Sequence, residues 1–390
     1  MNKFTTAFWA TAIMIFAIAT VSNATIRRVG YWGTPTALDY TNLQNAYNAS
    51  IGGDTIQVYP SSSNSANYGG ISAVTHKILI LGNGRSWGNF NDYGVVDTAN
   101  YNVQTITGSC NVGAIYLGVG SDSSVISGLS FNSGNCDIGY CNSTVKGING
   151  VIIQRCEFWG GCYINLDGNN DGNKIIDNYF ADGAISCNYY DHSSSTTNLK
   201  VSNNIFRCAS QFTYNVIYQY GSGVTGMFNN NIIRDPLFSS TNTGVIYLPT
   251  GRMVFENNIS NGLTLNAPLC MFYNNIGTGT EWPISSSLGS GNLQNIPYSS
   301  LFVNSFNNSP TLSPEARFVL KANSPAVNYY YGGSAASGGG TPDCGIYGGP
   351  TPHILSGVPA APVIYNVTAP ANNQPTNGSI QLIISAKTLN

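Results

Sequence analysis

The sequence predicts an all-β solenoid in which short strands stack coil upon coil. A six-residue unit recurs between residues 126 and 276: an apolar residue, two variable residues, usually Asn, one variable residue, then Phe or Ile. Its fourth positions are 27, 22, 26, 26, 27 and 17 residues apart and are occupied by Leu129, Cys156, Asn178, Asn204, Asn230, Asn257 and Asn274. A strand-like unit at this spacing is typical of a repeat protein. The segments between the units show no helical periodicity of apolar residues.

The recurring unit also has to stack in order to be stable. Each unit carries β-branched or aromatic residues but too little apolar surface to fold alone. Stacked coils lie about 4.8 Å apart, which would place the asparagines of successive units in a hydrogen-bonded column. Asparagine also tolerates the left-handed backbone of a sharp bend between strands. We therefore expect a ladder of Asn side chains and an interior stack of Phe and Ile.

The N-terminus has the pattern of a signal peptide, predicted over residues 1–24. Lys3 precedes the apolar run 6–21, and small residues suited to signal peptidase lead up to Ala24. The run is short for a membrane-spanning helix, and nothing comparable follows it. We expect a secreted or cell-surface protein that begins near Thr25 and has no membrane span after cleavage. A retained anchor is the alternative.

The segment after the signal peptide predicts a capped coil. In DYTNLQNAYNASIGGDTIQVYP (residues 39–60), Leu43, Ala46 and Tyr47 fall on one face of a short helix, which would cover the open end of a coil. A Gly-Asp-Thr turn and a strand follow it, and HKILILGNG (residues 76–84) has the pattern of the next coil.

These segments and the repeats resemble the right-handed parallel β-helix proteins of the pectin-lyase-like superfamily. Two downstream segments, LKANSPAVNYYYGG (320–333) and DCGIYGGPTP (343–352), are similar to the closing coils of its secreted bacterial members. The resemblance implies a single right-handed parallel β-helix domain over residues 25–350. It implies no single function, because this architecture hosts lyases, hydrolases, epimerases, adhesins and inert scaffolds.

The C-terminal residues 351–390 differ in texture and are predicted to form a strand-like cap. Prolines bound two strand-like runs, Val363–Val367 and Ile380–Ser385. The segment is too short for an independent domain, and the terminal repeats of a solenoid need shielding. A sorting tail is the alternative.

The composition narrows the range of partners. Charged residues make up 8% of the chain and the net charge is −2, so nothing favours binding to nucleic acid or to an anionic membrane. The 42% of hydrophobic residues and the 24 tyrosines argue against disorder. Nine cysteines follow the signal peptide without a CxxC pair. Export permits disulfides, but an odd number leaves at least one thiol free or paired elsewhere.

One loop contains the first half of a calcium-binding motif. Asp167, Asn169 and Asp171 stand at positions 1, 3 and 5 of an EF-hand-type loop with Gly172 at position 6, but position 12 is Asn178 in place of the bidentate Glu. The sequence requires no cofactor, and Ca²⁺ is the one candidate. The alternative is a plain turn, because Asp-Gly and Asn-Asn pairs are turn-forming.

Three basic residues are candidates for β-elimination on a uronate polymer, which needs a base and a cation beside the carboxylate. Lys174 and Lys200 precede the apolar residue of adjacent units and should stack one coil apart, and Arg155 lies in the preceding unit. The structural alternative is that Arg155 pairs with Asp177 across coils while the lysines extend into water.

Six aromatic residues form a candidate glycan surface. They lie in or beside loops rich in Gly, Ser and Asn, and they are Tyr189, Tyr190, Tyr218, Tyr220, Trp159 and Trp282. Sugar rings stack on such faces while amides bond their hydroxyls, which suits neutral or weakly charged glycans. Packing in the core or a cap is the alternative for any one of them.

The leading hypothesis is a non-catalytic extracellular protein that contacts a polysaccharide or cell-surface glycan, or serves as a surface or matrix component. A hydrolase on this fold would need several closely grouped carboxylates, and the sequence has no such group. Asp191, the one acidic residue beside a histidine, lies in a polar loop. The rival is a polysaccharide lyase that uses Lys174, Lys200 or Arg155, with or without calcium. A third hypothesis is a purely structural module that self-associates.

Overall fold

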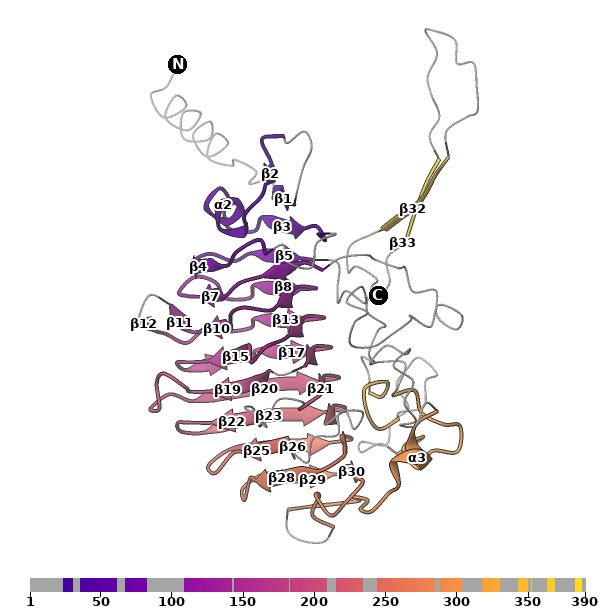
Figure 1. The fold of residues 1–390 in the computed structure, drawn as a ribbon. Coiled ribbons are helices and arrows are strands. Elements are labelled where there is room, and N and C mark those ends of the chain that lie inside the picture. Colours follow the sequence, from indigo (N-terminus) through magenta and orange to yellow (C-terminus); the bar gives the residue numbers. More distant parts are fainter. Residues whose placement is uncertain are drawn as a thin grey trace, which may run out of the picture.

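The structure is a computed structural model, and its strands wind into an elongated coil (Figure 1). It describes residues 24–30, 36–61, 67–82, 109–141, 144–181, 183–208, 215–233, 244–284, 288–303, 318–329, 343–349 and 352, together with the backbone of 363–368 and 383–387.

Three parallel sheets run along the coil, and each full turn contributes one strand to each sheet. Sheet I has 13 strands: β2 (Asp39–Tyr40), β1 (Ile26–Val29), β3 (Thr55–Val58), β5 (Leu79–Leu81), β8 (Val125–Ser127), β13 (Ile152–Gln154), β17 (Lys174–Ile176), β20 (Thr196–Ser202), β23 (Val224–Asn229), β26 (Arg252–Glu256), β29 (Met271–Tyr273), β31 (Gly289–Ser290) and, beside β20, β16 (Asn170–Asp171). Sheet II has eight: β6 (Asn111–Val112), β9 (Ser130–Phe131), β14 (Glu157–Phe158), β18 (Tyr179–Phe180), β21 (Ile205–Phe206), β24 (Ile232–Ile233), β27 (Ile259–Ser260) and β30 (Ile276–Gly277). Sheet III also has eight: β4 (Ile71–Val74), β7 (Ile115–Leu117), β10 (Cys136–Ile138), β15 (Tyr163–Leu166), β19 (Ala184–Cys187), β22 (Asn215–Gln219), β25 (Gly244–Tyr247) and β28 (Leu263–Asn266). The predicted parallel β-helix is therefore confirmed.

One left-handed residue turns the chain from sheet I into sheet II in each coil. The bend has φ between 49° and 59° at its non-glycine positions, which are Arg155, Asp177, Asn203, Asn230, Asn257 and Asn274. Gly128 and Gly291 occupy the same position in other coils. Asn and Gly tolerate this conformation with little strain, which explains why the repeat is rich in Asn at the bend.

The residue after each bend belongs to a buried asparagine ladder made of Asn178, Asn204, Asn231, Asn258, Asn275 and Asn292. The Nδ2 of Asn231 donates to the Val201 carbonyl (3.1 Å) and to the Oδ1 of Asn258 (3.0 Å). Its Oδ1 accepts from the backbone and side-chain nitrogens of Asn204. Every polar atom of the amide is satisfied inside the coil, so the predicted ladder exists.

The predicted register of the ladder was wrong by one residue from the fifth unit onward. Asn230, Asn257 and Asn274 occupy the bend, and the ladder residue is the next one in each case. The run GMFNNNII (226–233) contains two apolar residues, three Asn and two Ile in succession, so the spacing alone allows two alignments. The structure buries Phe228 and leaves Met227 39% exposed. A slip of one residue exchanges the two faces of a strand.

The interior of the coil holds a continuous aromatic stack. On sheet II, rings in successive coils lie 4.6–4.9 Å apart, and they are Phe131, Phe158, Phe180 and Phe206. The stack then crosses to sheet I and continues through Phe228, Phe255 and Phe272. The predicted phenylalanine stack is confirmed. The isoleucines predicted to continue it, Ile232, Ile259 and Ile276, face outward from sheet II.

The predicted N-terminal helix closes one end of the coil. Helix α2 (Leu43–Asn48) begins at Asn42, whose side chain accepts a hydrogen bond from the Asn45 N–H. It buries Leu43, Ala46 and Tyr47, the face that the sequence indicated. Figure 1 shows α2 at the indigo end, against the first strands.

The described residues of 298–303, 318–329 and 343–349 pack along the side of the coil. The outward isoleucines of sheet II are covered by Leu301, at the end of α3 (Tyr298–Leu301), and by Phe302, Phe318, Ala326, Cys344 and Ile346. The Nδ2 atoms of Asn203 and Asn230 donate to backbone carbonyls of residues 343–348. These segments therefore lie over sheet II and add no strand to it.

The remaining elements are two antiparallel hairpins. β11 (Tyr140–Cys141) and β12 (Thr144–Val145) project beside β10, and β32 (Val363–Thr368) pairs with β33 (Ile383–Lys387). The second pair confirms two strands in the C-terminal segment, with β33 displaced from the predicted run 380–385. Their role as a cap, and the boundary of the segment, stay predictions.

The described residues bear on export in two ways. Residues 1–23 of the predicted signal peptide lie outside them, and no described helix has the length and apolarity to cross a membrane. All nine cysteines are described, and every one is buried and outside a disulfide. The coil is therefore held by packing and hydrogen bonds without disulfides.

Candidate functional site

The two lysines stack on the outside of sheet I. The register of β17 and β20 places Lys174 opposite Lys200, as the repeat predicted. Burial, and then the neighbouring charge of Lys174, lower the pKa of Lys200. The next coil has Met227 in this column, so the positive pair spans two coils.

The predicted Arg155–Asp177 ion pair is not formed. The two ion pairs between side chains in the described ranges are Arg27–Asp54 (3.2 Å) and Arg28–Asp39 (2.7 Å). Arg155 instead occupies the left-handed bend of its coil, directly after β13, the strand that pairs with the Lys174 strand β17.

The candidate calcium loop has its oxygens engaged with the next coil. Asp167 Oδ1 accepts from the Tyr190 N–H (2.7 Å), and Asn169 Oδ1 accepts from the Ser195 N–H (3.1 Å). Asp171 Oδ1 accepts from side chains at residues 197 and 198, both at 2.7 Å. Each carboxylate or amide is turned toward a different residue, and no group of three His, Cys, Asp or Glu in the described residues could hold a metal. The residues fit a turn, and they do not converge as a calcium shell would require.

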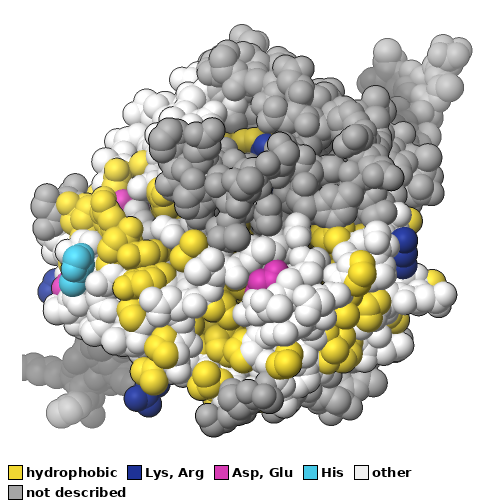
Figure 2. All heavy atoms as spheres, turned by 60° about the horizontal axis from the view of Figure 1, so that its bottom comes forward, with side chains coloured by type: hydrophobic (Ala, Val, Ile, Leu, Met, Phe, Trp, Pro, Cys, Tyr) yellow, Lys and Arg dark blue, Asp and Glu magenta, His cyan; other side chains and the backbone are white. Residues whose placement is uncertain are grey.

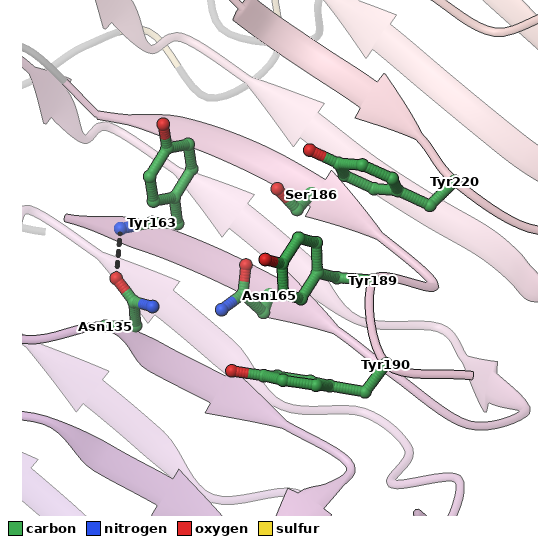
Figure 3. Close-up of a pocket in the computed structure, with 7 residues that line it drawn as sticks. All are labelled: Asn135, Tyr163, Asn165, Ser186, Tyr189, Tyr190 and Tyr220. Carbon is green, nitrogen blue, oxygen red and sulfur yellow. Dashed lines mark hydrogen bonds between the residues drawn. The ribbon is translucent and has the colours of Figure 1, made fainter. Parts of the chain in front are cut away.

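Four tyrosines and three small polar side chains line a pocket on the outer face of sheet III. Its volume is about 220 Å³. The lining residues come from β15, β19 and the loops beside β10, β19 and β22, and they are Asn135, Tyr163, Asn165, Ser186, Tyr189, Tyr190 and Tyr220 (Figure 3). Figure 3 shows the tyrosine rings around the two amides and the serine, with the Asn135 Oδ1 accepting from the Tyr163 N–H (2.9 Å). Three of the six predicted glycan-contact residues lie here.

The pocket tyrosines belong to a longer aromatic band. Tyr140 of β11 stacks on Tyr190 with ring centroids 3.9 Å apart, and Tyr189 meets Tyr190 edge-on at 4.8 Å. Tyr220 is 4.9 Å from Tyr189 and 4.4 Å from Tyr218. The predicted Tyr218 therefore adjoins the pocket as part of this band. Aromatic faces from several coils form one surface along the coil axis.

The two tryptophans do not belong to this surface. Trp282 is fully buried and packs on Phe255 and Phe272, so the prediction that it contacts glycans was wrong. It covers the last coil, because the aromatic stack needs a terminal partner. Trp159 lies beside sheet II, edge-on to Tyr179 and under the guanidinium of Arg207 (5.8 Å).

Two buried carboxylates adjoin the pocket. Asp137 of β10 is 1% exposed, and its Oδ1 accepts a 2.6 Å hydrogen bond from Nδ2 of the pocket residue Asn165. Burial, and then the charge of Asp167, raise the pKa of Asp137 to about 7, although the Asn165 bond opposes them. Burial also raises the pKa of Asp167, which is fully buried.

Two of the pocket phenols, Tyr190 and Tyr220, stay neutral in the physiological range. Burial, followed by the charge of Asp137 and the neighbouring phenols, raises the pKa of Tyr190 to about 12. Burial also raises the pKa of Tyr220. Neutral phenols both donate and accept hydrogen bonds, which is the capacity that sugar hydroxyls require.

The described surface elsewhere carries few charges. Figure 2 views the last-coil end and shows mostly uncharged polar and hydrophobic side chains, with Lys, Arg, Asp and Glu scattered singly. This agrees with the 8% charged composition. No extended basic groove for a polyanion is visible on the described part of this face.

Five residues in or beside the pocket were not predicted from the sequence: Asp137, Asn135, Tyr163, Asn165 and Ser186. Three of them occupy one outward column of sheet III, where the register pairs Asp137 with Asn165 and Asn165 with Ser186. The signal was a second repeat, apolar–variable–apolar, which recurs at Cys136–Ile138, Ile164–Leu166 and Ile185–Cys187. Aligning it would have placed these residues side by side.

Comparisons with known proteins add little beyond the architecture. No protein-family model matches the chain, and no curated protein matches it. Among solved structures, the crystal structure of the pectate lyase Pel9A is similar over 84% of this chain and 97% of that one, with 15% identity and a TM-score of 0.36. A likeness this distant carries no argument about activity, so the β-helix assignment rests on the three parallel sheets.

Proposed function

We propose that this protein is exported and binds glycans through the tyrosine pocket of sheet III, without cleaving them. The observation that carries the proposal is the pocket itself, in which tyrosine faces surround two amides and a hydroxyl. Aromatic faces stack on sugar rings, and amides and phenols bond sugar hydroxyls. Tyr189 and Tyr190 are 45% and 44% exposed, so a ligand can reach them.

The dimensions favour a chain over an isolated small molecule. A pocket of about 220 Å³ is smaller than the roughly 300–1,000 Å³ that hold drug-sized ligands, so it suits about one sugar ring. The aromatic band continues from Tyr140 to Tyr247, which stacks on Tyr218 at 4.5 Å. Further rings of a polysaccharide would lie on this band.

Titration calorimetry against a panel of neutral, acidic and amino oligosaccharides tests the proposal. Tyr190→Ala and Tyr220→Ala should each weaken binding about fivefold or more, because each removes one stacking face. Tyr273→Ala is the matched control, since Tyr273 lies on sheet I and its hydroxyl bonds the Met271 sulfur. Absence of binding to every member of the panel would refute glycan recognition.

The non-catalytic part of the proposal needs a product assay. Asp137 is the carboxyl nearest the pocket whose pKa of about 7 would let it exchange a proton at neutral pH. Reducing ends released by the wild type and abolished in Asp137→Asn would turn the binding site into an active site. We expect no product.

A second candidate function, a polysaccharide lyase, is favoured by one observation at sheet I. The pKa of Lys200 is lowered by burial and by Lys174, and a lysine with a lowered pKa is a suitable base for β-elimination. Unsaturated product from a polyuronate, lost in Lys200→Met and in Lys174→Met, would support the lyase. Running the assay with calcium and with chelator also tests the candidate ion at Asp167, Asn169 and Asp171.

Export is tested separately. N-terminal sequencing of protein recovered outside the cells should begin near Thr25. Recovery with residue 1 or its near neighbours retained would contradict cleavage of residues 1–24.

A further inference from the structure

Negative charge adjoins the tyrosine pocket, and no described lysine or arginine forms an ion pair with it. Asp137 contacts the pocket through Asn165, and Asp167 contacts it through the Tyr190 N–H. The Oδ2 of Asp167 is buried and has no hydrogen-bond partner. Buried carboxylates are ordinarily paired or fully hydrogen-bonded, because an uncompensated buried charge is costly. This site therefore has unused capacity for a positive group.

The groups around Asp137 supply no compensating charge. In sheet III, it lies between Tyr116 of β7 and Asn165 of β15. Tyr140 and Tyr190 stack on each other. After burial, the charge of Asp137 raises the pKa of Tyr190, so this phenol lies near the carboxylate. Asp167 adds a second negative charge. Both ion pairs of the described residues lie at the N-terminal end of the coil, remote from this site.

Three other titratable groups lie near the two carboxylates, on neighbouring elements. His192, whose charge acts on Asp167, has its Nε2 3.1 Å from the Tyr189 carbonyl. Lys146 follows β12; its side chain is exposed and forms no ion pair with a described carboxylate. Asp191 raises the pKa of Asp167 further. The balance of charge facing the pocket is negative.

The aromatic faces attract the same sign of charge as the carboxylates. A tyrosine ring carries negative potential on its face, which attracts a cation that lies within about 6 Å of the ring centroid. Tyr163, Tyr189, Tyr190 and Tyr220 all line the pocket. Because rings and carboxylates act together in a site partly shielded from water, a cation is favoured over a neutral or anionic group.

We propose that the pocket selects glycans that carry a positively charged amino group, such as chains of N-unsubstituted glucosamine, over N-acetylated and uronate-bearing chains. The inference rests on the proposed glycan binding and adds the chemical class of the ligand. A uronate would bring a third carboxylate beside Asp137 and Asp167, which like-charge repulsion disfavours. The ammonium group would lie against the tyrosine faces while the amides of Asn135 and Asn165 bond neighbouring hydroxyls.

Three hexamers separate charge from sugar recognition: N,N,N-trimethylated glucosamine, N-acetylglucosamine and galacturonic acid. The trimethylated glucosamine hexamer carries a positive charge that does not change with pH. Binding is measured by calorimetry at pH 8, where Asp137 is ionised because its pKa is about 7. We expect the cationic hexamer to bind about tenfold or more tighter than the N-acetylated one. Its affinity should fall between pH 8 and pH 6, while that of the N-acetylated hexamer stays constant.

Variants test which groups create the preference. Asp137→Asn keeps the shape and the Asn165 hydrogen bond, and it should remove most of the preference for the cationic hexamer without weakening the N-acetylated one. Asp171→Asn removes a carboxylate from the exposed position of β16 and should change neither affinity. Tyr190→Ala should weaken both hexamers. Added salt should weaken the cationic hexamer selectively.

The outcomes distinguish the two proposals. If no hexamer binds, the glycan-binding function fails. If the hexamers bind equally, if galacturonate binds tightest, or if Asp137→Asn leaves the preference intact, glycan binding stands and selection by charge is refuted. Thermal unfolding of Asp137→Asn at pH 8 shows whether the variant is folded in the assay.

Discussion

Replacing Asp137 by Asn should stabilise the protein at neutral and alkaline pH and leave it unchanged in acid. In the folded protein, burial and then the charge of Asp167 raise the pKa of Asp137 from its ordinary value of 3.8 to about 7. The folded state therefore holds this proton more tightly than the unfolded chain does. Stability from this group is complete below pH 4 and is lost as the pH rises through 7.

The magnitude follows from the two pKa values. At 1.36 kcal/mol per pH unit, the difference between 3.8 and about 7 corresponds to roughly 4 kcal/mol. About 3 kcal/mol of this falls between pH 5 and pH 8. Asp137 is 1% exposed, so solvent screening does not reduce the figure much. An asparagine resembles the protonated carboxyl in shape, and its Oδ1 can accept the same bond from Asn165.

Urea unfolding of both proteins at pH 5, 6, 7 and 8 measures the effect. The free energy of unfolding of Asp137→Asn should exceed that of the wild type by an amount that grows by about 3 kcal/mol across this range. Asp191→Asn is the matched control: exposed side-chain hydrogen bonds from residues 193 and 194 lower the pKa of Asp191, so its titration is complete below pH 5. A difference between Asp137→Asn and wild type that is constant from pH 5 to pH 8 would refute the reasoning.

Three other perturbations test the fold. Asn231→Ala removes a fully hydrogen-bonded ladder amide and should lower the free energy of unfolding, measured in urea, by about 2–4 kcal/mol. Asn274→Gly should lower it by under about 1 kcal/mol, because Gly291 occupies the same bend in the next coil. Equal losses of stability would contradict the corrected register. Trp282→Ala should lower the free energy of unfolding by about 3–5 kcal/mol, because it removes the side chain that covers the end of the aromatic stack. A loss under about 1 kcal/mol, as expected for an exposed residue, would count against this role. A thiol reagent should label none of the nine buried cysteines in native protein and all nine after denaturation; rapid labelling of native protein would show that the thiols are accessible.

The candidate site could be predicted from the sequence only in part. Tyr189, Tyr190 and Tyr220 were recognisable because aromatic residues in polar loops have few structural reasons to be there. Asp137 was not, because one aspartate in CDIGYC has no local partner, and its importance comes from Asn165, 28 residues away. The same limit misassigned Trp282, whose loop composition resembles that of a surface residue although the side chain covers the core.

What the sequence by itself determined is the architecture: a period of short strands, a bend rich in Asn, a ladder amide, and an N-terminal helix with one apolar face. These features are local and repetitive, so each coil carries the information for its own turn. The tertiary structure alone decided the register at GMFNNNII, the packing of described residues such as Leu301, Phe318 and Ile346 over sheet II, and the meeting of Asp137, Asn165 and Tyr190. The physical reason is that stacking joins residues 20 to 30 positions apart, and which face of a strand turns inward depends on the volume that the neighbouring coils leave free.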